Sequence, residues 1–144
     1  MAMAMDGAAL TDFLEREFPE VSGEFTILKV EPEIITVQLN TSARHLRPGG
    51  TVSGPSMFGL ADVTMYLAVL AQIGPVALAV TTNCSIDFMR KPAAGVPVVA
   101  EGRVLKLGRT LAVGDVLLRS GENGPIVARA SLTYAIPPKN DGVK

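Results

Sequence analysis

The spacing of hydrophobic and polar positions changes several times along this chain, and each change predicts a different element. Residues 10–18 place apolar side chains at helical spacing and are followed at once by Pro19, so we expect a short amphipathic helix that ends there. Residues 23–40 instead alternate apolar and polar side chains on both sides of a Glu-Pro-Glu segment at 31–33. This alternation predicts a β-hairpin.

The central segment, residues 54–73, is apolar on almost every helical face, which is typical of a helix buried in a protein core. Gly54 and Pro55 suit its first turn, because proline lacks the N–H group that would be unpaired there. A second glycine–proline pair follows Ile73 and suits its end. The only charged side chain in this segment is Asp62. An acid inside a buried helix suggests a functional role.

The last part of the chain predicts three to four further strands joined as a meander. An irregularity is expected at Gly114, and the whole order favours one antiparallel sheet that curves around the central helix. We expect a single domain over residues 1–144, with frayed tails at 1–9 and 138–144. The expected elements are a strand at 76–89, a turn at 92–95, a strand at 96–107, a tight connection at 108–109, a strand at 110–119, a turn at 121–124 and a strand at 126–136.

Composition narrows the possible partners. The 144 residues carry a net charge of −1 and contain no basic run longer than Arg90-Lys91, so the chain lacks the positive surface of a nucleic-acid-binding protein. A hydrophobic share of 48% is high for a small monomer, and it predicts a homo-oligomer. One histidine and one cysteine cannot form a disulfide framework or a His/Cys metal cluster, so neither a metal nor a cofactor is expected.

The chain is also expected to act in the cytoplasm, away from membranes. Its first residues, MAMAMDGAAL, contain no positive segment and no sustained apolar run of the kind found in secretory signals. Residues 60–80 match the length of a membrane-spanning helix, but they include Asp62, Gln72 and a helix-ending Gly-Pro pair. These features make spanning unfavourable.

Three segments of the chain resemble the PaaI-like acyl-CoA thioesterases, which have the hotdog fold. Residues 45–55, HLRPGGTVSGP, are similar to the family's loop His-x-Asn-x-x-Gly-x-x-His-Gly-Gly, and Asp62 lies where the family has its catalytic Asp or Glu. Residues 84–93, CSIDFMRKPA, and residues 104–112, VLKLGRTLA, resemble two of its strands. The resemblance extends over roughly residues 40–136 and implies an α+β hotdog fold: a curved antiparallel sheet wrapped around one long helix, with a short N-terminal helix.

The resemblance implies hydrolysis of a small acyl- or aryl-CoA thioester, with Asp62 as general base or nucleophile and the Gly54 amide polarising the carbonyl. Eight residues separate Gly54 from Asp62, which is about 12 Å along a helix. One copy of the chain therefore cannot aim both groups at the same carbonyl. We expect a dimer with sites shared between two copies, assembled as a dimer of dimers.

Three family positions are altered, which leaves other interpretations open. Ser53 replaces the family's His, and Arg47 replaces its Asn or Gln; Pro55 also replaces the second glycine. A non-catalytic hotdog module that binds acyl-CoA is therefore the alternative function, and a hydratase is disfavoured because His45 lies outside the helix start. Ser53 could equally be a helix cap, and Asp62 could pair with a basic residue such as Arg44, Arg47 or Arg90.

Further candidates for substrate binding are polar or aromatic residues near Asp62 and basic residues beside the strand turns. The first group could orient the carbonyl or line the acyl pocket, and the second could bind the phosphates of coenzyme A or lie solvated at the surface. The candidates are Arg47, Ser53, Pro55, Tyr66, Thr81, Thr82, Arg90, Lys91, Lys106 and Arg109.

Overall fold

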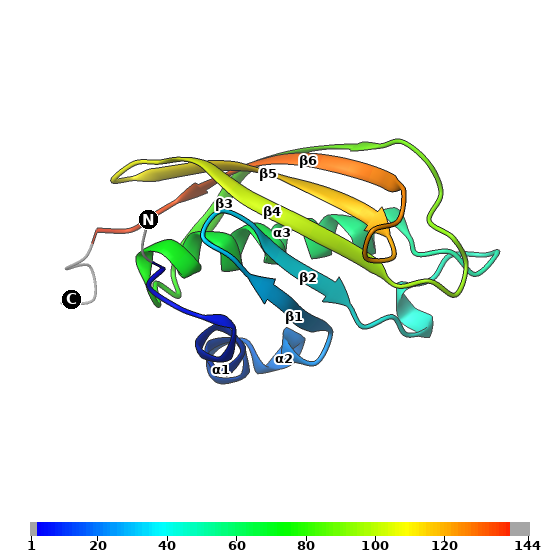
Figure 1. Cartoon of the computed structure of the whole chain (residues 1–144), viewed down its shortest axis with the longest axis horizontal. Helices are drawn as coiled ribbons and strands as arrows, with labels where there is room; N and C mark the ends of the chain where they lie inside the picture. Colours follow the sequence, from blue (N-terminus) through cyan, green and yellow to red (C-terminus); the bar gives the residue numbers. More distant parts are fainter. Residues whose placement is uncertain (1–2, 139–144) are drawn as a thin grey trace.

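The computed structural model describes residues 3–138, which form one six-stranded antiparallel sheet and its helices (Figure 1). The elements are α1 (Gly7–Glu17), α2 (Pro19–Ser22), β1 (Phe25–Val30), β2 (Ile35–Leu39), a 3₁₀ turn η1 (Ala43–His45), α3 (Gly54–Ile73), β3 (Val80–Phe88), β4 (Val98–Leu107), β5 (Leu111–Ser120) and β6 (Ile126–Ala135). Their order confirms the hairpin, the long helix and the short N-terminal helix that the sequence predicts.

The strands are ordered β1-β2-β4-β5-β6-β3 across the sheet. Only β4, β5 and β6 form a meander, because β3 lies beside β6 at the far edge and a long connection leads from it to β4. Thr81, near the start of β3, pairs in register with Tyr134, near the end of β6. This pairing places both residues at the same end of the sheet.

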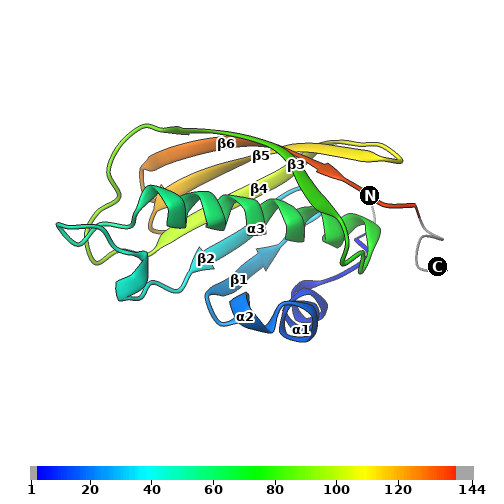
Figure 2. The same ribbon diagram turned by 180° about the vertical axis from the view of Figure 1, so that it is seen from behind.

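Helix α3 lies along one face of the curved sheet, which forms the layer behind it in Figure 2. Eleven of its residues are buried, and its N-terminal turn is capped by Ser53, whose hydroxyl accepts the Ser56 amide at 3.3 Å. Glycine lets the sheet approach α3 closely, because a Cβ on Gly114 of β5 would lie 2.6 Å from the terminal carbon of Met65 in α3. The side of α3 that faces away from the sheet is less covered, and Phe58 is 41% exposed there.

Several expected boundaries differ in the structure. Residues 3–9 are not frayed, because the amides of Ala4 and Met5 both donate to the carbonyl of Ala71 and α1 already begins at Gly7. Pro19 does end α1, but it also begins the one-turn helix α2. The expected tail at 138–144 lies outside the described residues beyond position 138.

The strand expected from position 76 begins at Val80, since the apolar residues before it form a turn that packs on the core. The irregularity expected at Gly114 occurs in the facing strand, where β4 gains one residue between Val104 and Lys106. Gly114 pairs with Val104 at the edge of this irregularity, where a Cβ would lie 2.3 Å from the backbone oxygen of Arg103 and 2.6 Å from Met65. By length and composition α3 could span a membrane, yet 61% of its apolar window is buried inside the protein.

Candidate active site

Helix α3 positions the carboxylate of Asp62 against the end of the sheet where β3 begins and β6 ends. The Thr81 hydroxyl donates to Oδ1 of Asp62 at 2.5 Å, and the Tyr134 hydroxyl donates to the same oxygen at 2.6 Å. The Tyr134 oxygen also lies 3.0 Å from the backbone carbonyl oxygen of Asp62. Two neighbouring strands therefore hold one oxygen of this carboxylate.

This arrangement gives the two carboxylate oxygens different environments. Oδ1 accepts from two hydroxyls, while Oδ2 makes no hydrogen bond or ion pair within residues 3–138. A carboxylate oxygen with open lone pairs can accept a proton from water or attack a carbonyl carbon. The idea that Asp62 pairs with a basic side chain is wrong for the described part of the chain, where Arg44 pairs with Glu24 instead.

Asp62 opens into an apolar pocket of about 280 Å³ between the N-terminal helices, α3 and the start of β3. Tyr66, one helical turn after Asp62, lines this pocket as the sequence suggests. Its hydroxyl donates to the carbonyl of Ala77 at 3.0 Å. The lining residues are Leu14, Phe18, Val21, Asp62, Val63, Tyr66, Ala79, Val80, Thr81 and Tyr134.

Burial and the charge of Asp62 keep the neighbouring acids neutral. Burial, followed by the Asp62 charge, raises the pKa of the Tyr134 phenol far above its usual value, so the phenol acts as a hydrogen-bond donor. The same two causes raise the pKa of the Cys84 thiol. Because the thiol stays protonated at neutral pH, Cys84 is a poor nucleophile compared with Asp62.

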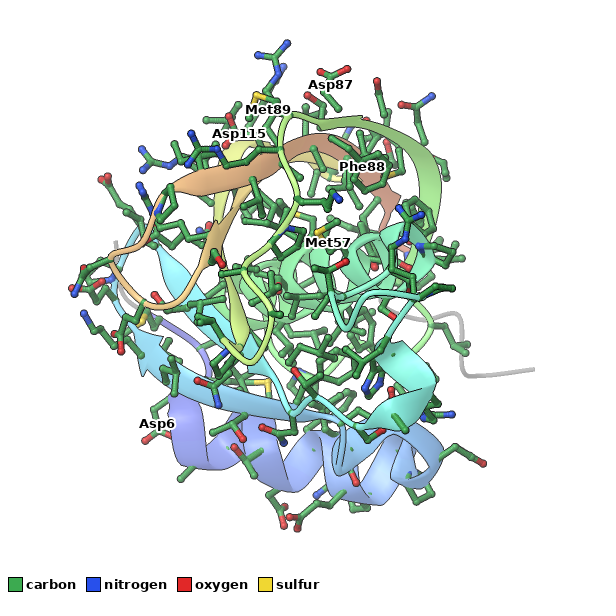
Figure 3. The ribbon with its side chains drawn as sticks, turned by 90° about the vertical axis from the view of Figure 1, so that its right-hand side faces the viewer. Asp6, Met57, Asp87, Phe88, Met89 and Asp115 are labelled. Carbon is green, nitrogen blue, oxygen red and sulfur yellow. The ribbon has the colours of Figure 1, made fainter. Side chains whose placement is uncertain are left out.

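The start of α3 forms a second polar region, separate from Asp62. Ser53 is the N-cap, so its hydroxyl is engaged by the Ser56 amide and itself donates to the Ser56 hydroxyl at 3.0 Å. Gly54 follows it, and a Cβ there would lie 3.5 Å from the ring of Phe88. Figure 3 shows Phe88 on the side of the β3 end that is nearer Met57, whereas Asp87 and Met89 on either side point away from it, and the Phe88 side chain is still 51% exposed. Phe88 thus packs over the helix start.

Comparison with known proteins identifies the family. The model of the Thioesterase superfamily matches residues 49–127, which include the helix start and Asp62. The chain belongs to the Thioesterase superfamily. The resemblance to the PaaI-like hotdog thioesterases is thereby confirmed, together with the fold that it implies.

Three superfamily members illustrate the similarity. A crystal structure from Silicibacter sp. TM1040, described as a candidate thioesterase, is 56% identical with a TM-score of 0.89 and covers 96% of each chain. A point mutant of the phenylacetic acid degradation protein PaaI from Thermus thermophilus is 29% identical with a TM-score of 0.70, over 83% of this chain and 99% of that one. Human acyl-coenzyme A thioesterase 13 is 28% identical over 118 residues, which are 82% of this chain and 84% of the relative.

Within this superfamily fold, the other residues proposed for substrate binding do not reach Asp62. Arg47 is exposed in the turn before α3, and Pro55 is exposed in its first turn. Thr82 points away from the pocket and donates to the carbonyl of Thr133 at 3.3 Å. In one copy of the chain, Thr81 and Tyr66 are therefore the only members of that set that line the Asp62 pocket.

The four basic candidates do not form one phosphate-binding group within a single chain. Arg90 and Lys91 follow the end of β3, whereas Lys106 and Arg109 lie at the turn between β4 and β5. The strand register places these two pairs at opposite ends of the sheet. Phe88 at the end of β3 pairs with Ala128 of β6, and Ala128 pairs with Leu118 near the end of β5. Lys106 and Arg109 instead lie near Leu111, at the start of β5. All four side chains are exposed.

The main partner of Asp62, Tyr134, is not among the residues that the sequence pattern indicates. The alternation of the last strand makes it an apolar position, although a buried tyrosine hydroxyl normally needs a hydrogen-bond partner. The chain has only two tyrosines, and both line the pocket. The pattern also gives no sign that Leu14 in α1 and Phe18 just after it reach the pocket wall.

Proposed function

We propose that this protein is a homo-oligomeric acyl-CoA thioesterase in which Asp62 acts on the thioester. The observation that carries this proposal is the carboxylate itself: Oδ1 is held by Thr81 and Tyr134, and Oδ2 is left open at an apolar pocket. Membership of the Thioesterase superfamily supports thioester hydrolysis, and the human relative supports acyl-CoA as the thioester.

Two routes use the same carboxylate. As a general base, Oδ2 takes a proton from water while the water oxygen attacks the carbonyl carbon; the C–S bond then breaks, and the leaving thiolate is protonated. As a nucleophile, Oδ2 attacks the carbonyl carbon and displaces the thiolate, and water cleaves the resulting anhydride. Both routes release a carboxylic acid and the thiol of coenzyme A.

The proposed oxyanion donor is the Gly54 amide of a second copy. Gly54 and Asp62 are about 12 Å apart along α3, so one copy cannot supply both groups. The free edge of β3 offers a way to combine them, since antiparallel pairing of two β3 strands would bring the Phe88 end of one copy beside the Val80 end of the other. Phe88 packs on Gly54, and Val80 lines the Asp62 pocket.

The proposed assembly is a dimer with two shared sites, further paired as a tetramer, acting in the cytoplasm. Several large apolar side chains on and near β3 support association of copies, because Val80 is 56% exposed and Met89 is 53% exposed. Gel filtration with light scattering tests this assembly. An active, strictly monomeric protein would contradict the shared site.

The decisive experiment measures thiol release from a panel of acyl-CoA esters. We expect wild-type protein to release coenzyme A and Asp62→Asn to lose this activity almost completely, because the amide is neither a base nor a nucleophile. Asp12→Asn is the matched control, since Asp12 is an exposed acid on α1 that pairs with Arg16. Full activity in Asp62→Asn would refute the role of Asp62.

A second function has one observation in its favour. Ser53 replaces the family histidine, and its hydroxyl is engaged as the helix cap. A hotdog module that binds acyl-CoA without hydrolysing it would fit this change. Calorimetry with hexanoyl-CoA separates the two functions, because binding without thiol release supports the module, whereas turnover supports the thioesterase.

A further inference from the structure

The hydroxyl groups that line the Asp62 pocket are all engaged within the protein. Tyr66 donates to the carbonyl of Ala77, and Thr81 and Tyr134 both donate to Asp62. Each hydroxyl has a single hydrogen to donate. Within the described lining, a polar acceptor on a bound acyl group would therefore find no free side-chain donor.

The rest of the pocket wall is apolar. Its aromatic side is formed by Phe18 and Tyr66, whose rings meet edge to face at a centroid distance of 5.7 Å, and by Tyr134 behind them. The aliphatic lining consists of Leu14, Val21, Val63, Ala79 and Val80. Such a wall favours hydrocarbon surface, because burying an unpaired polar group costs free energy.

The size of the pocket limits the acyl group further. A cavity of about 150 Å³ lined by aliphatic and aromatic side chains is large enough to bind benzene. In a single copy of the chain, the pocket beside Asp62 holds about 280 Å³, roughly twice that volume. It can accommodate one aromatic ring with a short extension or a chain of medium length.

We propose that this pocket selects thioesters of compact, unsubstituted apolar acids, aromatic or medium-chain, and rejects acyl groups that end in a carboxylate. The proposal rests on the thioesterase function above and adds the class of acyl group. A terminal carboxylate would enter a pocket whose one charged group, Asp62, is also negative. It would lose its hydration, meet no donor in the lining and be repelled by that charge.

The first test compares acyl groups that differ in one feature. Hexanoyl-CoA and adipoyl-CoA have the same chain length, and only adipoyl-CoA ends in a carboxylate. We expect kcat/KM for hexanoyl-CoA to exceed that for adipoyl-CoA by at least about 100-fold, because an apolar pocket already discriminates by about that factor against an analogue that adds only a hydroxyl. Benzoyl-CoA should be accepted, and palmitoyl-CoA should be turned over more slowly than hexanoyl-CoA because its chain exceeds the pocket.

Two substitutions test the pocket wall directly. Val21→Arg places a cation at the wall, so the ratio of adipoyl-CoA to hexanoyl-CoA turnover should rise by at least about tenfold. Phe18→Ala removes a ring from the same wall and should raise the ratio of palmitoyl-CoA to hexanoyl-CoA turnover. Leu105→Ala is the control for both, because this exposed apolar side chain lies outside the pocket and should change neither ratio.

The outcomes separate this inference from the proposed function. If no thioester is hydrolysed, or if Asp62→Asn keeps full activity, the proposed function fails. If hydrolysis depends on Asp62 but hexanoyl-CoA and adipoyl-CoA react at similar kcat/KM, the assignment of the acyl class is overturned and the thioesterase function stands. If both folded wall variants keep the wild-type turnover ratios, the assignment is also overturned, because the acyl group must then bind in another pocket.

Discussion

Replacement of Tyr134 by Phe removes one hydroxyl and keeps the ring that packs on Tyr66. The lost hydroxyl donates to Oδ1 of Asp62 at 2.6 Å and is only 3% exposed, so water cannot easily replace it. A hydrogen bond to a charged group contributes about 1.5–3 kcal/mol. If the transition state loses the whole contribution of this hydrogen bond in the variant, kcat/KM falls by about 10- to 100-fold.

A matched variant distinguishes this role from general loosening of the fold. Tyr66→Phe also removes one buried phenol hydroxyl, but that hydroxyl donates to the Ala77 carbonyl and not to Asp62. It should therefore lower kcat/KM less than Tyr134→Phe does.

The assay is continuous thiol release from hexanoyl-CoA at neutral pH, combined with urea unfolding of each variant. Thr81→Ser keeps the second hydroxyl on Oδ1, and Thr81→Val removes it, so activity should follow the hydroxyl and not the size of the side chain. A folded Tyr134→Phe protein with wild-type kcat/KM would refute the claim that Tyr134 positions Asp62.

Two further predictions concern the fold. Burial, followed by the charge of Arg44, lowers the pKa of His45 below its ordinary 6.5, so the unfolded chain binds a proton first as the pH falls. The stabilisation that depends on neutral His45 should be complete above pH 6.5 and should be lost as the pH falls through the lowered pKa of the folded protein. His45→Gln removes the chain's only histidine, so it should flatten this part of the curve of unfolding free energy against pH, measured by urea unfolding. Gly114→Ala should cost roughly 1–3 kcal/mol, because its Cβ would lie 2.3 Å from the backbone carbonyl oxygen of Arg103 and would also overlap the end of Met65. Gly59→Ala, with open space around it, should gain up to about 1 kcal/mol, and equal urea midpoints for the two variants would contradict this account.

His45 shows how tertiary structure changes the interpretation of a residue. The sequence alone places it in the loop before the helix start. In the structure it is buried beside α3: its Nδ1 accepts the Ser42 amide at 2.9 Å, and its Nε2 lies 3.2 Å from Glu24. The His45 carbonyl also accepts the Ser53 amide at 2.8 Å, so this turn supports the helix start. Its role is structural.

The amino-acid sequence by itself determined the elements and the position of the acid. The helical and alternating periods depend only on which face of a segment is apolar, and the glycine–proline pairs at Gly54 and Gly74 fix the limits of α3 through backbone geometry. The spacing between Gly54 and Asp62 likewise follows from helical rise alone. For these reasons the order of the elements and the special position of Asp62 could be predicted, whereas the hotdog fold was implied by the resemblance to the PaaI-like family.

Only the tertiary structure decided what surrounds Asp62. A strand has the same alternation whatever strand it pairs with, so the sequence pattern could not place β3 beside β6, where Thr81 and Tyr134 become neighbours. The same uncertainty let Lys106 and Arg109 be grouped with Arg90 and Lys91, although the sheet separates them. Local periodicity encodes which side of a segment is buried, whereas the partners of a side chain depend on long-range pairing.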